Sequence, residues 1–364
     1  LFEKHPEFVQ PEARRNEVIG RLRAAEGLQD VPVSRTSFSW GIPVPGAPGH
    51  VTYVWIDALF NYVTALGLFE KDGGGAKAKY WPAQFHVIGK EILWFHAVIW
   101  PALLMALKLP LPQCVYAHSF WIREGRKMSK TLGNFIDLPT IEAYCAAYSR
   151  DAYRWYMLTQ GPLGATDADF AHGKFIEVYN ADLANGIGNA SSRVANMIAK
   201  YFDGKQPTGA ATTHAGRNWP ALALAAMEEA QTEIGALDVA SALRAGLGLS
   251  NKVDAYIHET EPFKLAKDPA KMAEVGTILA NSAEALRIAA VLLSPAMPEK
   301  MSDLLRRLGQ EAPDEKGRFA KPLKELCAWG GLKPGTAIVK GDALFPRADP
   351  EAPAPVAATS EAQA

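Results

Sequence analysis

The chain has 364 residues, of which 48% are hydrophobic and 21% are charged, and its formal net charge is −1. Such a chain can bury a substantial core and is long enough for two or three domains. A net charge this close to zero excludes attraction of a polyanion by the field of the whole molecule, so such a partner must meet local patches of charge. The three cysteines, Cys114, Cys145 and Cys327, have no C-x-x-C spacing, which excludes a readable disulfide framework or cysteine zinc site.

The chain begins with charged and turn-forming segments. Residues 1–27 predict a helix, and the Pro/Gly-rich residues 34–50 predict a turn region. The β-branched and aromatic residues at 51–56 predict a strand, followed by a helix that ends near Leu66. The chain has no initiator methionine and opens within a helical pattern, so we expect it to be a fragment whose N-terminal part is missing.

A longer apolar region follows. Residues 85–107 predict a short strand, a turn at Gly89 and a long helix, and residues 113–122 predict another buried strand. Strand, helix and strand in this order favour a parallel sheet of the doubly wound kind. The apolar run at residues 92–112 has the length of a membrane span, but the histidine, lysine and prolines within it favour a buried helix.

The second half of the chain has a different pattern. From Phe175 to Arg307 it has helical periodicity with short breaks, and its Ala-rich windows predict an antiparallel helix bundle. The residues after Phe345 are rich in Pro and Ala and lack aromatic side chains, so the segment 346–364 is predicted to be a disordered tail.

A cluster of cations lies in the loop "GRKMSKTLGNF", residues 125–135, which follows a predicted buried strand. Lys127 and Lys130 can close onto phosphate oxygens, because lysine is a mobile point charge, and Ser129 can add a hydroxyl donor. Such lysines would stabilise the charge that develops on a leaving pyrophosphate. The alternative is an ordinary solvated basic loop.

This loop resembles the KMSKS signature of the class I aminoacyl-tRNA synthetases, and its surroundings resemble the methionyl-tRNA synthetase family. The similarity extends over roughly the first 270 residues and includes the segments "HPEFVQPEARRNEV", "SRTSFSWGIPVPG", "VTYVWIDALFNYVTALG", "FHVIGKEILWFHAVIWPALLMA" and "NADLANGIGNASSRVANM". The resemblance implies that Lys127, Ser129 and Lys130 form a mobile loop that helps ATP react with methionine.

Two predicted helices carry aromatic side chains at helical spacing. Trp55, Ala58 and Tyr62 share one helical face, and Ile92 and His96 share another, so that two such faces could form an aromatic cleft. A polarizable sulfur gains from aromatic contact, so this cleft suits a methionine side chain. The alternative is an ordinary buried core with a satisfied histidine. The resemblance implies that these five residues line the methionine pocket.

The predicted turn between the strand and the helix carries Gly89 and Glu91. A glycine there lets a nucleotide approach the backbone, and a carboxylate can accept hydrogen bonds from ribose hydroxyls. The alternative for Glu91 is a carboxylate favoured by a helix N-terminus.

A polar stripe is predicted in the helical half, where Asn185, Asn189 and Arg193 are four residues apart. Amides and a guanidinium can recognise the edges of unstacked bases, although any solvated helix face can have this composition. The resemblance implies that these three residues read the anticodon, and that Pro262 and Phe263 match a Pro-Trp pair whose aromatic ring stacks on an anticodon base.

Together these features predict an α/β fold in which the second half of a Rossmann-type doubly wound parallel sheet precedes an α-helical bundle that binds the anticodon. The expected division is residues 1–118 for the sheet with a preceding helical linker, 119–174 for the KMSK loop and a connecting region, 175–345 for the bundle, and 346–364 for the tail. The family's His-x-Gly-His signature and its zinc knuckle are absent from these residues, so we expect no zinc site and no activity of the fragment alone.

The resemblance implies that the full-length protein is a ligase that activates methionine with ATP and Mg²⁺ and transfers it to tRNA(Met). The expected setting is the cytoplasm, with no membrane association and a monomer favoured. Two alternatives remain: a non-catalytic tRNA-binding protein derived from a synthetase, or a class I synthetase for another apolar amino acid such as leucine or cysteine.

Overall fold

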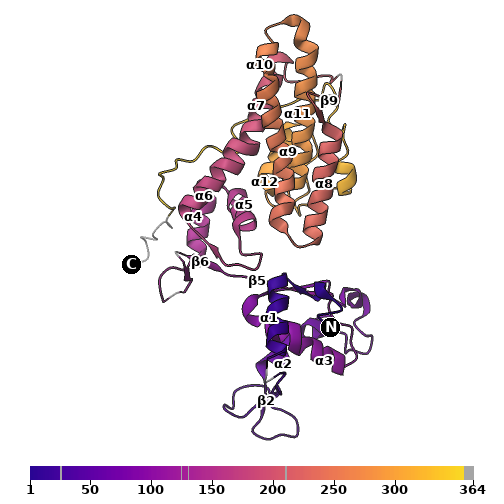
Figure 1. Cartoon of the computed structure of the whole chain (residues 1–364), viewed down its shortest axis with the longest axis vertical. Helices are drawn as coiled ribbons and strands as arrows, with labels where there is room; N and C mark the ends of the chain where they lie inside the picture. Colours follow the sequence, from indigo (N-terminus) through magenta and orange to yellow (C-terminus); the bar gives the residue numbers. More distant parts are fainter. Residues whose placement is uncertain (25–26, 124, 130, 210, 356–364) are drawn as a thin grey trace. The chain divides into compact units, whose positions relative to one another are not determined.

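The computed structural model describes residues 1–24, 27–123, 125–129, 131–209 and 211–355, and it divides into two compact units (Figure 1). Unit 1 comprises Leu1–Phe120 and Pro162–Ala168, and unit 2 comprises Trp121–Gly161 and Asp169–Ala364. The chain therefore passes from one unit to the other three times.

Unit 1 is built around a parallel three-stranded sheet with the order β1-β5-β4. Residue Val9 of β1 pairs with Val115 of β5, and Phe85 of β4 pairs with Cys114. The elements of unit 1 are η1 (Pro6–Phe8), β1 (Val9–Gln10), α1 (Glu12–Leu22), β2 (Ser34–Arg35), β3 (Val51–Thr52), α2 (Val54–Thr64), η2 (Gly75–Tyr80), β4 (Phe85–Gly89), η3 (Lys90–Ile92), η4 (Phe95–Ile99), α3 (Trp100–Ala106) and β5 (Cys114–His118). The predicted parallel sheet is confirmed.

Two predictions for the start of the chain are wrong in detail. Residues 1–27 do not form one helix, because Pro11 starts α1 at Glu12 and the preceding Val9–Gln10 join the sheet as β1. The segment 51–56 is not one strand, since β3 ends at Thr52 and α2 begins at Val54. Leu59 and Val63, four residues apart, are fully buried on α2, so helical packing outweighs the strand propensity of this segment.

The helix predicted after Gly89 is present but irregular. A 3₁₀ turn (η3) and a π-helical segment (η4) precede α3. Pro101 lacks an N–H, and its ring would clash with the carbonyl of Ala97 in a regular α-helix, which accounts for a wider turn at this place. Because a π-helix has more residues per turn than an α-helix, residues after Phe95 do not follow the α-helical spacing.

Unit 2 is mostly helical. Its elements are β6 (Trp121–Arg123), β7 (Arg126–Lys127), α4 (Leu138–Tyr148), α5 (Arg150–Gln160), α6 (His172–Val178), η5 (Tyr179–Gly188), α7 (Asn189–Tyr201), β9 (Thr213–His214), β10 (Arg217–Asn218), α8 (Trp219–Gly235), α9 (Val239–Thr260), α10 (Pro262–Leu265), η6 (Pro269–Lys271), α11 (Met272–Leu293), α12 (Pro298–Arg307) and α13 (Leu323–Leu326), and β8 (Ala168–Asp169) lies at the boundary between the units. The helices predicted between Phe175 and Arg307 are confirmed, with a short hairpin, β9–β10, before α8.

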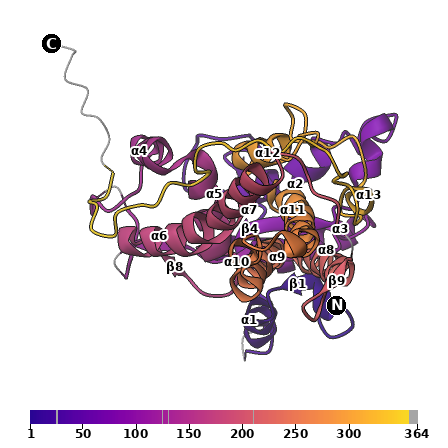
Figure 2. The ribbon, with the colours of Figure 1, turned by 90° about the horizontal axis from the view of Figure 1, so that it is seen from above.

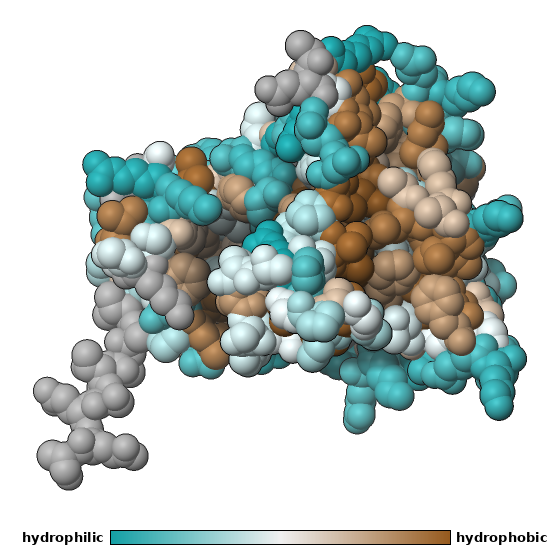
Figure 3. Space-filling view, turned by 90° about the horizontal axis from the view of Figure 1, so that it is seen from below, coloured by the Kyte–Doolittle hydropathy of each residue, from teal (hydrophilic) through white to brown (hydrophobic). Residues whose placement is uncertain are grey.

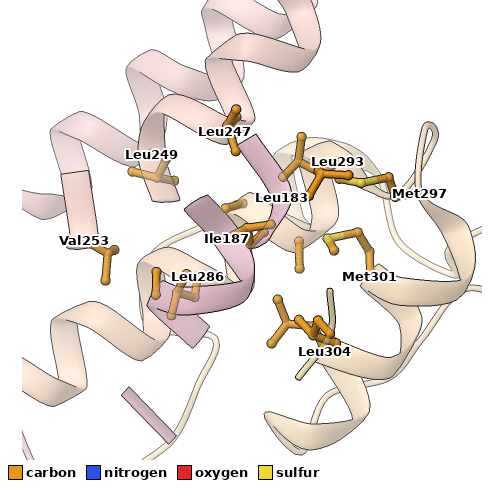
Figure 4. Packing of buried hydrophobic residues seen from close by; sticks show 14 of the residues in the cluster. Leu183, Ile187, Leu247, Leu249, Val253, Leu286, Leu293, Met297, Met301 and Leu304 are labelled. Atoms are coloured by element: carbon orange, nitrogen blue, oxygen red, sulfur yellow. The ribbon is translucent and has the colours of Figure 1, made fainter. Parts of the chain in front are cut away.

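Helices α8, α9 and α11 pack side by side in unit 2, as two views agree (Figures 1 and 2). Every residue of α11 from Val275 to Leu293 is buried. Figure 4 shows Leu183 and Ile187 of η5 between Leu247 of α9 and Leu293 near the end of α11. A Cβ on Gly246 would lie 3.0 Å from the Cβ of Leu292, so glycine permits this close approach of α9 and α11.

The C-terminal segment differs from the prediction of disorder over residues 346–355. The side-chain amide of Asn180 donates to the carbonyl of Ala348 (3.0 Å), and its oxygen accepts from the Ala348 N–H (2.9 Å). The hydroxyl of Tyr179 donates to the carbonyl of Pro346 (2.7 Å). Long-range hydrogen bonds of this kind leave no local signature in a Pro/Ala-rich sequence, and the prediction for residues 356–364 falls outside the described residues.

Candidate functional site

The face of unit 1 that was predicted to form an aromatic cleft contains a polar pair between α2 and η4. The hydroxyl of Tyr62 and Nε2 of His96 are 2.8 Å apart, and Nδ1 of His96 lies 3.1 Å from the carbonyl oxygen of Ile92. A carbonyl can only accept, so Nδ1 carries the proton of the neutral ring, and Nε2 accepts from the Tyr62 hydroxyl. The pair is thereby held in one orientation.

Aromatic rings surround this pair. Trp55 stacks on Phe95 with ring centroids 4.0 Å apart and an interplanar angle of 10°, and it meets His96 edge-on at 6.3 Å. Ala58 of α2 and Ile92 of η3 are half-buried. Phe95 was missed by the sequence analysis, although its position three residues after Ile92, which is a same-face spacing on a helix, could have identified it.

A second histidine lies behind the pair. His86 of β4 is buried and accepts a hydrogen bond from Nε1 of Trp100 (3.3 Å), and its ring lies 4.3 Å from that of Tyr62. Burial, with a smaller contribution from His96, lowers the pKa of His86 to about 4. Burial also lowers the pKa of His96 and raises the pKa of Tyr62, so all three groups are neutral near pH 7.

We expect the chain to lose stability as pH falls, because His86 is uncharged in the folded state. Its pKa is about 4 when folded and 6.5 ordinarily, so between these values the unfolded chain binds more protons. His86 therefore stabilises the fold fully above pH 6.5, and its contribution is lost progressively as pH falls toward 4. This amounts to about 2 kcal/mol between roughly pH 7 and pH 5. Urea unfolding across this range measures it.

The matched comparison uses two histidine variants. His86→Gln keeps an acceptor for Trp100 and removes the titrating group, so its unfolding free energy should vary less with pH than that of the wild type. His258→Gln, at an exposed position on α9, should leave the wild-type pH dependence unchanged. An equal pH dependence in His86→Gln and the wild type would contradict the argument.

The predicted nucleotide turn follows β4. Gly89 ends the strand, and a Cβ at this position would lie 2.3 Å from Oε2 of Glu91, so the exposed carboxylate of Glu91 lies directly over the glycine. Lys90 lies between them and pairs with Asp167, with Nζ and Oδ1 2.6 Å apart. At this turn the backbone of Gly89, which has no side chain, therefore lies beside the carboxylate of Glu91.

The lysine loop is braced by a side chain that the sequence analysis missed. Asn134 accepts from the Ser129 N–H (2.9 Å) and donates to the Lys127 carbonyl (3.3 Å). The Ser129 hydroxyl oxygen accepts from the Leu132 N–H (3.1 Å). Lys127 is exposed at the end of β7, and Lys130 lies outside the described residues. An asparagine after a glycine, as in "LGN", is the turn signal that could have identified the brace.

Two of the three residues of the predicted polar stripe lie on one regular helix. Asn189 and Arg193 lie on α7, four residues apart, whereas Asn185 lies before a kink at Gly186, whose φ and ψ of −83° and −112° are not helical. Asn185 and Asn189 are exposed. Pro262 is buried at the start of α10, and the neighbouring Phe263 is 42% exposed, which leaves part of its ring accessible.

Within the part of the chain that the structure describes, no group of three or more His, Cys, Asp or Glu side chains is arranged to hold a metal ion. One helical segment, Pro269–Leu293, is long and apolar enough to cross a membrane, but its most apolar window is completely buried inside the fold. It forms the core of unit 2.

The family follows from a comparison with known proteins. The family model described as tRNA synthetases class I (M) matches residues 3–195, and the chain belongs to the class I tRNA synthetases. A methionine–tRNA ligase of Caldanaerobacter subterraneus is 42% identical over 96% of this chain, and one of Bacillus subtilis is 41% identical over 96%. Within the class, its family is therefore that of the methionyl-tRNA synthetases, which confirms the resemblance.

Solved structures agree with this assignment. A methionyl-tRNA synthetase of Mycobacterium tuberculosis in complex with methionyl-adenylate is 38% identical, with a TM-score of 0.82 over 95% of this chain and 65% of that one. The free form of the same enzyme gives a TM-score of 0.80. The chain spans about half the length of the curated relatives it matches, 53% and 51% for the two named above.

Proposed function

We propose that the full-length protein is a methionine–tRNA ligase. Methionine and ATP react to form methionyl-adenylate and pyrophosphate, and the terminal ribose hydroxyl of tRNA(Met) then attacks the acyl carbonyl and releases AMP. The observation that carries this proposal is the Tyr62–His96 hydrogen bond beside the stacked Trp55 and Phe95, in a chain of the methionyl family. No covalent nucleophile on the protein is needed, because catalysis is mainly positioning and charge stabilisation.

The methionine side chain would occupy the cleft lined by Trp55, Ala58, Tyr62, Ile92 and His96. A thioether gains from contact with aromatic rings, whereas leucine lacks the polarizable sulfur and is branched. The Tyr62 hydroxyl is already engaged by His96, so the pocket wall offers apolar ring faces with little uncompensated polarity. This arrangement supports methionine over a charged or strongly polar side chain.

ATP would bind at Gly89 and Glu91 and at the lysine loop. The nucleotide would approach the backbone at Gly89 beside the Glu91 carboxylate that lies over it, and Glu91 would accept from the ribose hydroxyls. Lys127, Ser129 and Lys130 would contact the phosphates, with the Asn134 hydrogen bonds supporting the shape of the loop. Mg²⁺ would accompany ATP as part of the substrate.

The helical part of unit 2 would bind tRNA. Asn185, Asn189 and Arg193 would read bases of the anticodon, and Phe263, preceded by Pro262, would stack on one of them. The partial exposure of Phe263 supports this role, since stacking requires an accessible ring face. Stacking of this kind contributes about 1–3 kcal/mol per base.

We infer further that unit 1 is the second half of a Rossmann-type sheet and that the domains follow the division into 1–118, 119–174 and 175–345. Residues 346–364 would follow as a C-terminal segment that is attached to η5 at Pro346 and Ala348. The three-stranded sheet exposes Phe85 and Val87 on one face of β4, although parallel sheets are normally covered on both faces. Figure 3 shows hydrophobic side chains gathered on one face of the molecule. The relatives are about twice as long as this chain, which supports a further part of the protein that completes the sheet. We propose that this part is the N-terminal half and that the enzyme is cytoplasmic and monomeric.

Exchange of labelled pyrophosphate into ATP tests the proposal. The full-length protein should catalyse exchange with methionine and, at equal concentration, much less with leucine or cysteine. The isolated 364-residue chain should give no exchange. Exchange that prefers leucine would favour a synthetase for another amino acid. Tight binding of tRNA(Met) without exchange by the full-length protein would favour a non-catalytic tRNA-binding protein, and normal exchange by the isolated chain would refute the need for a missing half.

A further inference from the structure

Helices α7 and α9 are joined at the surface of unit 2 by an ion pair that the sequence analysis did not anticipate. Nη1 of Arg193 donates to Oδ1 of Asp254 over 2.6 Å, and Nδ2 of Asn189 donates to the same oxygen over 3.3 Å. Arg193 and Asn189 are the two members of the polar stripe that lie on α7. One carboxylate on α9 therefore holds both side chains.

Most of the hydrogen-bonding capacity of Arg193 is left over. Its guanidinium has five N–H donors, and among the described residues only the bond to Asp254 engages one of them. The Arg193 side chain is 31% exposed, and Asn189 is exposed. The remaining donors thus belong to a guanidinium that a short bond anchors to α9 and that is partly accessible to a ligand.

The carboxylate of Asp254 also affects which kind of ligand the remaining N–H donors of Arg193 favour. A guanidinium with an anionic oxygen 2.6 Å away forms a pair with no net charge, so its attraction for a phosphate is largely cancelled. A nucleobase edge is uncharged, and its carbonyl or ring-nitrogen acceptors can still take the N–H bonds. The pair therefore favours bases over the sugar–phosphate backbone.

We propose that Asp254 is a positioning residue for RNA recognition, which orients Arg193 and Asn189 toward base edges and prevents Arg193 from acting as a phosphate-binding charge. The proposal rests on the proposed function and deepens it. Contacts to bases supply specificity, whereas contacts to phosphates supply affinity that depends on salt and little on sequence. Asp254 thus lowers the affinity for RNA that phosphate contacts would give and raises the selectivity for the anticodon bases.

The test uses the full-length protein with tRNA(Met) and with the same tRNA carrying one changed anticodon base. Binding is measured by fluorescence anisotropy over a range of salt concentrations. Asp254→Asn has the same shape and removes the charge, and it should lower the preference for the native anticodon about tenfold. It should also steepen the dependence of log K on log salt by about 0.7, the value for one further phosphate contact on a single strand. Pyrophosphate exchange with methionine should not change.

Two further variants separate positioning from folding and from general charge. In an Arg193→Ala background, Asp254→Asn should have a smaller additional effect on anticodon preference, because only Asn189 is then left for Asp254 to orient. Glu259→Gln removes a carboxylate from another arginine pair on α9, that with Arg217 at 2.7 Å, and should leave the anticodon preference unchanged.

The outcomes distinguish the inference from the function on which it rests. Normal discrimination by the wild type, with the same preference and the same salt dependence in Asp254→Asn, overturns the inference alone. An equal loss of preference on Asp254→Asn with and without Arg193 also overturns it, because a general disturbance of the helices would then explain the loss. A wild-type protein that does not distinguish the two tRNAs overturns both the anticodon role of α7 and this inference.

Discussion

Replacement of Glu284 by alanine is expected to lower the free energy of unfolding by about 3–5 kcal/mol, because it leaves a buried arginine without its counter-ion. Glu284 and Arg287 lie one turn apart on α11, and their side chains are only 4% and 5% exposed. Arg287 donates through Nη2 to Glu284 over 2.8 Å and to the carbonyl of Ala328 over 2.8 Å.

The carboxylate of Glu284 has a second role that adds to this cost. It accepts hydrogen bonds of 2.8 Å from three consecutive backbone N–H groups, those of Gly330, Gly331 and Leu332. A Cβ on Gly331 would lie 2.7 Å from Cζ of Arg287, so the loop approaches the ion pair closely. Without Glu284 these donors lose their partner within the fold, and the loop after α13 should detach from α11.

Urea unfolding followed by far-ultraviolet circular dichroism measures the effect, and a matched pair provides the control. Glu177 on α6 pairs with Lys174 at the same spacing of three residues, but the two side chains are 65% and 46% exposed. Glu177→Ala should therefore change the unfolding free energy by less than about 0.5 kcal/mol. Similar effects of the two substitutions would refute the assignment of stability to the buried pair.

Local periodicity was sufficient to predict part of the sheet and the helical faces that carry Tyr62 and His96. The family resemblance, and not the spacing, favoured bringing these two faces together, and the two side chains meet at 2.8 Å. Strand β5 was recognisable because a short continuous apolar run is typical of a strand buried on both faces. For the helical faces and for β5 the information lies within a few residues of the chain.

What was missed depends on contacts between distant residues. Buried His86 accepts a hydrogen bond from Trp100 and lies against the ring of Tyr62. The alternation of buried and exposed residues in β4 does not predict these contacts, and neither does the helical spacing in α2. Asp254 meets Arg193 across 61 positions of sequence. The π-helical segment Phe95–Ile99 was also not predicted, because a regular helix was expected up to Leu107.

Loss of the lysine at position 127 is expected to lower the rate of methionine activation by the full-length protein about 10²–10³-fold, because a cation that meets the departing pyrophosphate stabilises charge that develops only in the transition state. Lys127→Ala should accordingly reduce kcat for pyrophosphate exchange while leaving the KM for methionine almost unchanged, since the proposed methionine cleft is formed by other residues. Replacing Lys130 together with Lys127 should reduce the rate further.

The neighbouring arginine provides a control for this experiment. Arg126 and Lys127 are successive residues of β7, so their side chains point to opposite faces of the ribbon, and Arg126 pairs across it with Arg123. Arg126→Ala removes the same charge from the same loop without removing the lysine that is proposed to contact the phosphates, and kcat should change less than about threefold. If Arg126→Ala is as slow as Lys127→Ala, the loop acts through its general positive charge. If neither variant is slow, the loop does not stabilise the transition state.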